Sequence, residues 1–139
     1  MVAGFWDGTL RIYDIILSEA IVEIKLTTTI THTAISAGGG YLAAFNREDR
    51  VVLIKLATGE QHALWSSAGG SVVSLRFTPD GRLMAGCSDR TARLWSVADA
   101  RPLHMIDAGH LSRRMAWMPE RKLLVTSAGS VKVWEGELP

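Results

Sequence analysis

Residues 78–96, TPDGRLMAGCSDRTARLWS, decide the fold that this sequence predicts. Pro79-Asp80-Gly81 is a turn signal, because proline and glycine favour the backbone angles of tight turns. TARLWS at 91–96 then alternates polar and apolar side chains with the period of two that marks a half-buried strand. Asp89 precedes this run by two residues, where a short carboxylate can accept hydrogen bonds from the N–H groups of a turn. The stretch therefore predicts two strands joined by a hairpin.

Alternating runs of the same kind recur along the chain. Four of them carry an aromatic or apolar anchor near their end: TLRIYD (9–14), VVLIK (51–55), TARLWS (91–96) and SVKVWE (130–135). Successive anchors are 41, 41 and 39 residues apart, namely Tyr13, Ile54, Trp95 and Trp134. A fixed step of about 40 residues is the length of a four-stranded blade of a β-propeller.

This period predicts an all-β chain of about 3.5 blades and roughly 14 strands. We expect strands b, c and d of a first blade at 1–26, complete blades at 27–65 and 66–107, and strands a, b and c of a last blade at 108–139. Closed propellers have about four to eight blades. The ring is therefore expected to be completed by the rest of a longer chain or by another chain, because open strand edges invite pairing.

The repeats resemble those of the WD-repeat family, which run from Gly-His through a strand and Ser-Pro-Asp-Gly to Asp-x-Thr-Val-Arg-Leu-Trp-Asp. Residues 7–14, DGTLRIYD, match the last part, with Tyr13 in the place of the tryptophan. Thr78-Pro79-Asp80-Gly81 and residues 89–95 match most of a repeat, and Gly109-His110 and Trp134-Glu135 match the ends of another. The resemblance covers essentially the whole chain and implies a β-propeller. It also implies structural roles for Asp7, Asp89, Trp95, His110 and Trp134.

The repeats also depart from the family pattern. Family members often link the histidine, a serine or threonine, the turn aspartate and the tryptophan by hydrogen bonds, and no repeat here has all four. The third repeat has Asp89 and Trp95 but Gly69-Gly70 in the place of Gly-His, and the second has Glu48 in the place of the aspartate. We therefore expect the blades to be held mostly by packing.

The composition fits a folded chain without a strong overall charge. Apolar residues make up 47% of the sequence, and 15 Lys and Arg stand against 14 Asp and Glu. This balance gives no field to attract nucleic acid or an anionic membrane, so nucleic acid is expected to be absent or peripheral. No apolar run is long enough to span a membrane. The predicted location is intracellular and cytoplasmic, with nuclear and cytoskeletal locations left open.

No residue pattern predicts catalysis, a cofactor or a metal site. The four histidines are dispersed and lack the spacing of a zinc site. The expected innermost strands, THTAIS, SVVSLRF and SRRMAW, supply one histidine and no carboxylate for a channel active site. Cys87, the single cysteine, cannot form an internal disulfide and is expected to be buried and unreactive. The sequence therefore predicts that the chain is not an enzyme.

A candidate contact surface follows from the propeller layout, in which b–c turns and d–a connections emerge on the same face. Aligning the repeats places Trp6 and Arg47 in one turn position, with Arg50 and Arg90 close behind. Arg113 falls in the innermost strand, where side chains line the channel or rise to its rim. Trp and Arg are enriched at the energetic centres of protein interfaces. We expect these five residues to bind a partner. The alternatives are a Trp6 folded back onto its own blade and arginines that are merely solvated.

The leading functional hypothesis is a protein-interaction scaffold, a subunit of a larger macromolecular assembly whose partners are other protein subunits. One alternative is an RNA-associated scaffold subunit of a ribonucleoprotein, which touches RNA through a basic loop. Another is a propeller enzyme with an active site in the channel. The absence of carboxylates from the expected inner strands argues against this last alternative.

Overall fold

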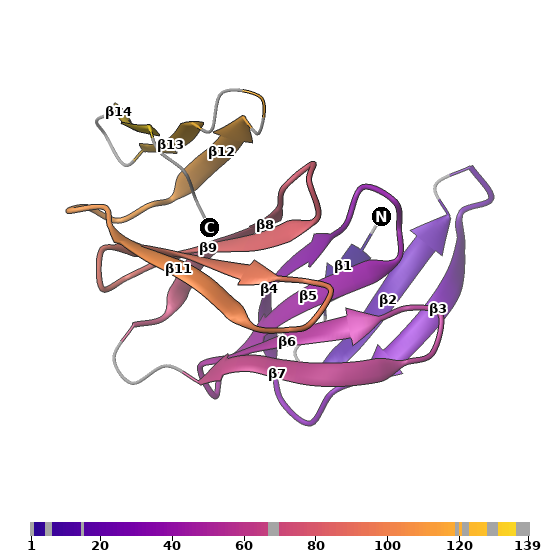
Figure 1. The fold of residues 1–139 in the computed structure, drawn as a ribbon. Helices are drawn as coiled ribbons and strands as arrows, with labels where there is room; N and C mark the ends of the chain where they lie inside the picture. The colour runs from indigo at the N-terminus through magenta and orange to yellow at the C-terminus, as the bar shows by residue number, and fades with distance from the viewer. Residues whose placement is uncertain are drawn as a thin grey trace. The chain divides into compact units, whose positions relative to one another are not determined.

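Residues 2–4, 7–14, 16–66, 70–118, 120, 123–127 and 131–135 are described by the computed structural model of the chain (Figure 1). They include fourteen strands, the number that the repeat period predicts. The strands are β1 (Val2–Gly4), β2 (Thr9–Asp14), β3 (Glu19–Lys25), β4 (Ile30–Ile35), β5 (Tyr41–Asn46), β6 (Arg50–Lys55), β7 (Glu60–Ser66), β8 (Val72–Phe77), β9 (Arg82–Cys87), β10 (Thr91–Ser96), β11 (Pro102–Asp107), β12 (Arg114–Met118), β13 (Leu123–Ser127) and β14 (Val131–Glu135). Within this part of the chain there is no helix long and apolar enough to cross a membrane.

The strands form four antiparallel sheets in which sequence neighbours pair. Their strand orders are β1-β2-β3, β4-β5-β6-β7, β8-β9-β10-β11 and β12-β13-β14, here called the first to fourth sheets. The chain divides into two compact units, Met1–Ser66 with the first two sheets and Ser67–Pro139 with the other two. The predicted all-β class is confirmed.

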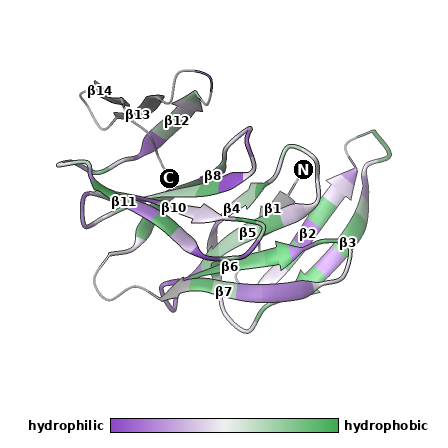
Figure 2. Ribbon diagram, viewed as in Figure 1, coloured by the Kyte–Doolittle hydropathy of each residue, from purple (hydrophilic) through white to green (hydrophobic). Residues whose placement is uncertain are grey.

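Burial changes from strand to strand within each four-stranded sheet. β5 and β9 are buried at every position except the first, and their sequences, YLAAFN and RLMAGC, are nearly continuous apolar runs. A strand covered on both faces needs apolar side chains on both, so alternation is lost there. In contrast, β7 and β11 are largely exposed, and Figure 2 shows β7 as mostly hydrophilic beside the hydrophobic β6.

The core of the first unit is an aliphatic cluster contributed by the first and second sheets and the connection between them. Leu10 and Leu42 are 0% exposed, as expected for side chains sealed between two packed sheets. Its buried members are Leu10, Leu26, Ile30, Leu42, Ala44 and Ile54.

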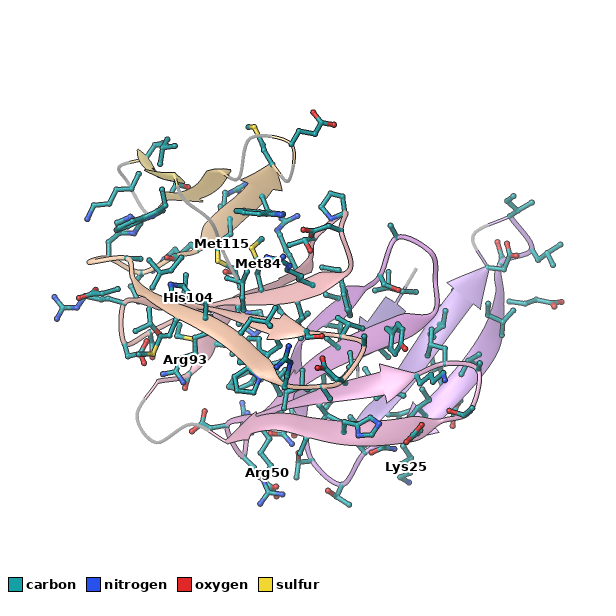
Figure 3. The ribbon with its side chains drawn as sticks, in the orientation of Figure 1. Lys25, Arg50, Met84, Arg93, His104 and Met115 are labelled. Carbon is teal, nitrogen blue, oxygen red and sulfur yellow. The ribbon has the colours of Figure 1, made fainter. Side chains whose placement is uncertain are left out.

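The core of the second unit joins the third and fourth sheets. Met84 and Leu94 of the third sheet pack against Met115 and Trp117 of β12, and Figure 3 shows Met84 and Met115 close to one another. Trp117 Nε1 also donates a hydrogen bond to Asp80 Oδ2 at 3.2 Å. The turn predicted at 79–81 is therefore present and helps to join the two sheets.

Ser74 differs from the simple alternation of polar and apolar side chains in its strand. The pairing of β8 with β9 shifts register between Val72 and Ser74, and Ser74 lies opposite Gly86. Ser74 is buried there, and a Cβ on Gly86 would lie 2.7 Å from Ser74 Oγ. Ser74 Oγ donates a hydrogen bond to Ser112 O at 2.6 Å. The buried hydroxyl is thereby satisfied and fixes the connection that leads to β12.

Candidate functional site: turns and exposed arginines

In the first unit, the β2 hairpin turn, the connection from β3 to β4 and the β5–β6 turn meet at one end. Leu26 N donates to Gly8 O at 2.9 Å, and Arg47 N donates to Thr29 O at 3.0 Å. We call residues 7–8, 26–29 and 47–49 the turn end of the first unit. Because backbone hydrogen bonds join its segments, side chains that project from it are held on a fixed frame.

The second unit repeats this arrangement. Ser88 N donates to Ser71 O at 2.8 Å, and Ala108 N donates to Arg90 O at 2.9 Å. Residues 70–71, 88–90 and 108–113 form the turn end of the second unit. Within each unit, the turns and connections that the propeller layout assigns to one face are therefore neighbours.

Asp89 fixes the turn between β9 and β10. Its Oδ1 accepts hydrogen bonds from Thr91 N at 3.0 Å and Thr91 Oγ1 at 2.6 Å, and its Oδ2 accepts one from Arg93 Nη2 at 2.8 Å. Burial raises the pKa of Asp89, but the hydrogen bonds from Thr91 and Arg93 outweigh it and leave the pKa below the usual 3.8. A Cβ on Gly70 would lie 2.7 Å from Asp89 Cγ. Gly70, in the place where the family has Gly-His, thus leaves room for this carboxylate.

We expect Asp89→Ala to lower the free energy of unfolding of the second unit by about 1 kcal/mol or more at neutral pH, the scale of lost turn hydrogen bonds. Because folding lowers the pKa of Asp89, this stabilisation is present above the unfolded pKa and disappears as pH falls through the folded value. Urea unfolding at about pH 7 and about pH 3 should show the difference from wild type shrinking in acid. Unchanged unfolding together with lost partner binding would make Asp89 a contact residue instead.

Asp7 occupies the equivalent turn of the first sheet and accepts a hydrogen bond from Thr9 N at 3.0 Å. That bond lowers the pKa of Asp7. The second sheet uses a different residue, which the sequence reasoning missed. Asn46 Oδ1 accepts from Glu48 N at 3.1 Å and from Arg50 N at 2.9 Å. The signal available in the sequence was an asparagine directly after the apolar run YLAAF at 41–45.

The other three residues with implied structural roles lie in the second unit. Trp95 is 2% exposed on β10. His110 is half-buried in the connection to β12, with Nδ1 3.3 Å from Leu111 O. Trp134 is half-buried on β14, and Lys132 Nζ lies 5.8 Å from the centroid of its ring. All three side chains are therefore at least partly shielded from solvent.

The arginines of the candidate contact surface are all exposed, but they are divided between the two units. Arg47 and Arg50 flank the β5–β6 turn of the first unit. Arg90 ends the β9–β10 turn of the second unit, and Arg113 lies just before β12. This strand begins at Arg114, whereas the predicted inner strand SRRMAW included both arginines. Trp6, the proposed centre of the surface, lies outside the described residues.

Neither a metal-binding cluster nor a reactive cysteine is found among the described side chains. No group of three or more His, Cys, Asp or Glu residues in the described ranges could hold a metal ion. Cys87 is a buried free cysteine, and burial raises the pKa of its thiol to about 11. The thiol is therefore protonated at neutral pH and is a poor nucleophile, as the sequence predicted.

Comparison with known proteins agrees with this geometry. The family model described as WD domain, G-beta repeat matches residues 56–96, which run from the end of β6 through β10. A chain in a solved structure titled "Crystal Structure of Mitotic Checkpoint Complex" is similar with a TM-score of 0.77 at 17% identity, covering 96% of this chain and 43% of that one. Residues 56–96 of this chain are therefore similar to a WD repeat. At such low identity, the structural similarity supports the fold, a partial WD-repeat propeller.

Curated relatives match parts of the chain. It is 34% identical over 71 residues to "Small ribosomal subunit protein RACK1z" of Oryza sativa subsp. japonica, which covers 50% of this chain and 21% of the relative. It is 29% identical over 73 residues to "Ribosome biogenesis protein BOP1 homolog" of Aedes aegypti, which covers 52% of this chain and 8% of the relative. These matches span only a small fraction of each relative.

Proposed function

We propose that this WD-repeat chain is a protein-interaction scaffold, a subunit of a larger macromolecular assembly. The observation that carries the proposal is the pair of turn ends, where exposed arginines project from turns fixed by hydrogen bonds. Rigid loops on a stable sheet framework are suited to binding because little conformational entropy is lost on association. Trp6, Arg47, Arg50, Arg90 and Arg113 are the proposed contact residues.

Several further features belong to this proposal. The chain catalyses no reaction, takes no cofactor and has protein subunits as partners, without a membrane. Each sheet is one blade, or part of one, with blades at 1–26, 27–65, 66–107 and 108–139. Another segment or another chain completes the ring. The expected location is intracellular and cytoplasmic.

An RNA-associated scaffold is the second candidate, because two relatives carry names that refer to the ribosome and to its biogenesis. In that function the chain holds proteins together within a ribonucleoprotein and touches RNA at most peripherally. The two candidates predict the same protein contacts. They differ in whether those contacts depend on RNA.

Affinity purification of the tagged chain followed by mass spectrometry tests both candidates. A protein scaffold should retain a specific set of proteins after ribonuclease treatment, whereas loss of that set would favour the ribonucleoprotein. Capture of no protein above the level of an untagged control would contradict the scaffold function.

A further inference from the structure

The two units carry opposite charge, although the whole chain is nearly neutral. Residues 67–139 contain ten Lys and Arg and seven Asp and Glu, whereas residues 1–66 contain five and seven. The excess of basic residues therefore lies in the second unit.

Three exposed arginines lie at or next to the turn end of this unit: Arg90, Arg113 and Arg114. Among the described residues, none of their guanidinium groups forms an ion pair or a side-chain hydrogen bond. Of the nearby carboxylates, Asp89 is paired with Arg93, whereas Asp107 Oδ1 accepts from Gly109 N at 2.9 Å and keeps its negative charge. Among the described residues, three arginines against this one carboxylate leave the turn end with net positive charge.

Hydrogen bonds anchor both ends of the connection that separates Arg90 from Arg113 and Arg114. Arg90 O accepts from Ala108 N at 2.9 Å, which joins the β9–β10 turn to the start of the connection. At the other end of that connection, Ser112 is 0% exposed, and its carbonyl accepts from Ser74 Oγ. Arg113 and Arg114 follow this anchored residue directly.

Arg90 occupies a left-handed turn position, as the non-glycine residues Ser18, Asp49 and Ala100 also do. Gly8, Asp49 and Arg90 occupy equivalent turn positions 41 residues apart, and all have positive φ, at 83°, 57° and 70°. Left-handed backbone disfavours most side chains, so glycine is the least strained choice there. Strained residues of this kind concentrate at functional sites.

We propose that the turn end of the second unit binds an acidic segment of a partner protein through Arg90, Arg113 and Arg114. This inference rests on the proposed scaffold function and adds the chemistry of the partner. Arginine suits carboxylates because its planar guanidinium donates two parallel hydrogen bonds to them.

Nucleic acid is a poorer fit to the same surface. Binding of single strands relies on exposed aromatic rings on which bases stack. The described aromatic side chains of this unit, Phe77, Trp95, Trp117 and Trp134, are buried or half-buried. Three arginines also offer few phosphate contacts compared with the many that dominate nucleic-acid affinity.

Fluorescence anisotropy with a labelled peptide of alternating glutamate and glycine tests the proposal on the full chain. The peptide should bind at low salt and be released as salt rises, because exposed charges are screened. A matched glutamine–glycine peptide should not bind, and a polyuridylate oligonucleotide of equal charge should bind more weakly. Tighter binding of the oligonucleotide would overturn the proposal in favour of nucleic acid.

The triple variant Arg90→Gln/Arg113→Gln/Arg114→Gln should bind the peptide about tenfold more weakly. Lys25→Gln/Lys55→Gln/Arg101→Gln removes equal charge from residues that are not part of this turn end and should bind like wild type. Equal losses in the two variants would overturn the proposal.

Arg90→Gly is a second test that should not disturb the fold, because glycine relieves the strain of the positive φ of 70°. This variant should weaken peptide binding without lowering the melting temperature. Unchanged peptide binding would show that Arg90 does not contact the peptide.

The two levels of the proposal can fail separately. If wild type captures proteins that the triple variant captures equally well, the scaffold function stands and the acidic partner is wrong. If wild type captures no protein, the scaffold function fails, whatever the peptide measurement gives.

Discussion

Leu94→Ala is expected to lower the free energy of unfolding of the second unit by about 3 kcal/mol, within the usual range for leucine truncation in a core. Leu94 is 1% exposed and packs in the cluster that joins the third and fourth sheets. Truncation removes apolar contacts and leaves a cavity between two sheets whose backbones are tied by their own ladders. The packing that connects neighbouring repeats is therefore weakened directly.

Urea unfolding followed by tryptophan fluorescence measures this effect, because three of the five tryptophans, Trp95, Trp117 and Trp134, lie in the second unit. Met105→Ala is the matched control, since Met105 is 60% exposed on the adjacent strand β11. It should change stability by less than about 0.5 kcal/mol. Equal effects of the two substitutions would contradict the packing of the third sheet against the fourth.

Gly8→Ala is expected to destabilise the first unit by about 3 kcal/mol, combining backbone strain with steric overlap. Gly8 has a φ of +83°, and a Cβ there would overlap the carbonyl oxygen of Leu26 and lie 2.8 Å from that of Thr28. The hydrogen bond from Leu26 N to Gly8 O holds the two segments together, so the clash is not easily relieved.

Gly39→Ala separates the two causes, because Gly39 also has a positive φ, +67°, but a Cβ added there would meet nothing within 4 Å. It should therefore cost only about 1 kcal/mol, the strain of left-handed backbone. Hydrogen exchange of peptides from 9–25 and 30–55 reports the stability of this unit. If Gly8→Ala costs no more than Gly39→Ala, the turn is not packed against the connection as described.

Much of the fold can be predicted from the sequence because each repeat encodes it again. The anchors Tyr13, Ile54, Trp95 and Trp134 keep an almost constant step, and turn residues such as Asp80 and Asp89 mark where strands end. Asn46 and Ser74 were harder to predict. Asn46 replaces the turn aspartate from two positions earlier. Ser74 is a polar residue buried opposite Gly86, where it donates a hydrogen bond to a carbonyl that is distant in sequence.

The candidate site is less predictable, because it depends on how charges are distributed in space. The sequence identified Arg90 and Arg113 from their turn positions, but the near-neutral total charge concealed the basic second unit. Whether an arginine is paired is also a three-dimensional property. Arg93 is paired with Asp89, whereas Arg90, three residues earlier, is not paired with any described side chain.

The most direct test of the scaffold function compares the proteins captured by three tagged forms of the chain by quantitative mass spectrometry. The forms are wild type, Arg90→Gln/Arg113→Gln/Arg114→Gln, and the charge-matched Lys25→Gln/Lys55→Gln/Arg101→Gln. We predict that wild type and the charge-matched form capture the same ribonuclease-resistant set of proteins, and that the first triple variant loses most of it while its melting temperature is unchanged. Capture of no specific protein by the folded wild-type chain would contradict the scaffold function.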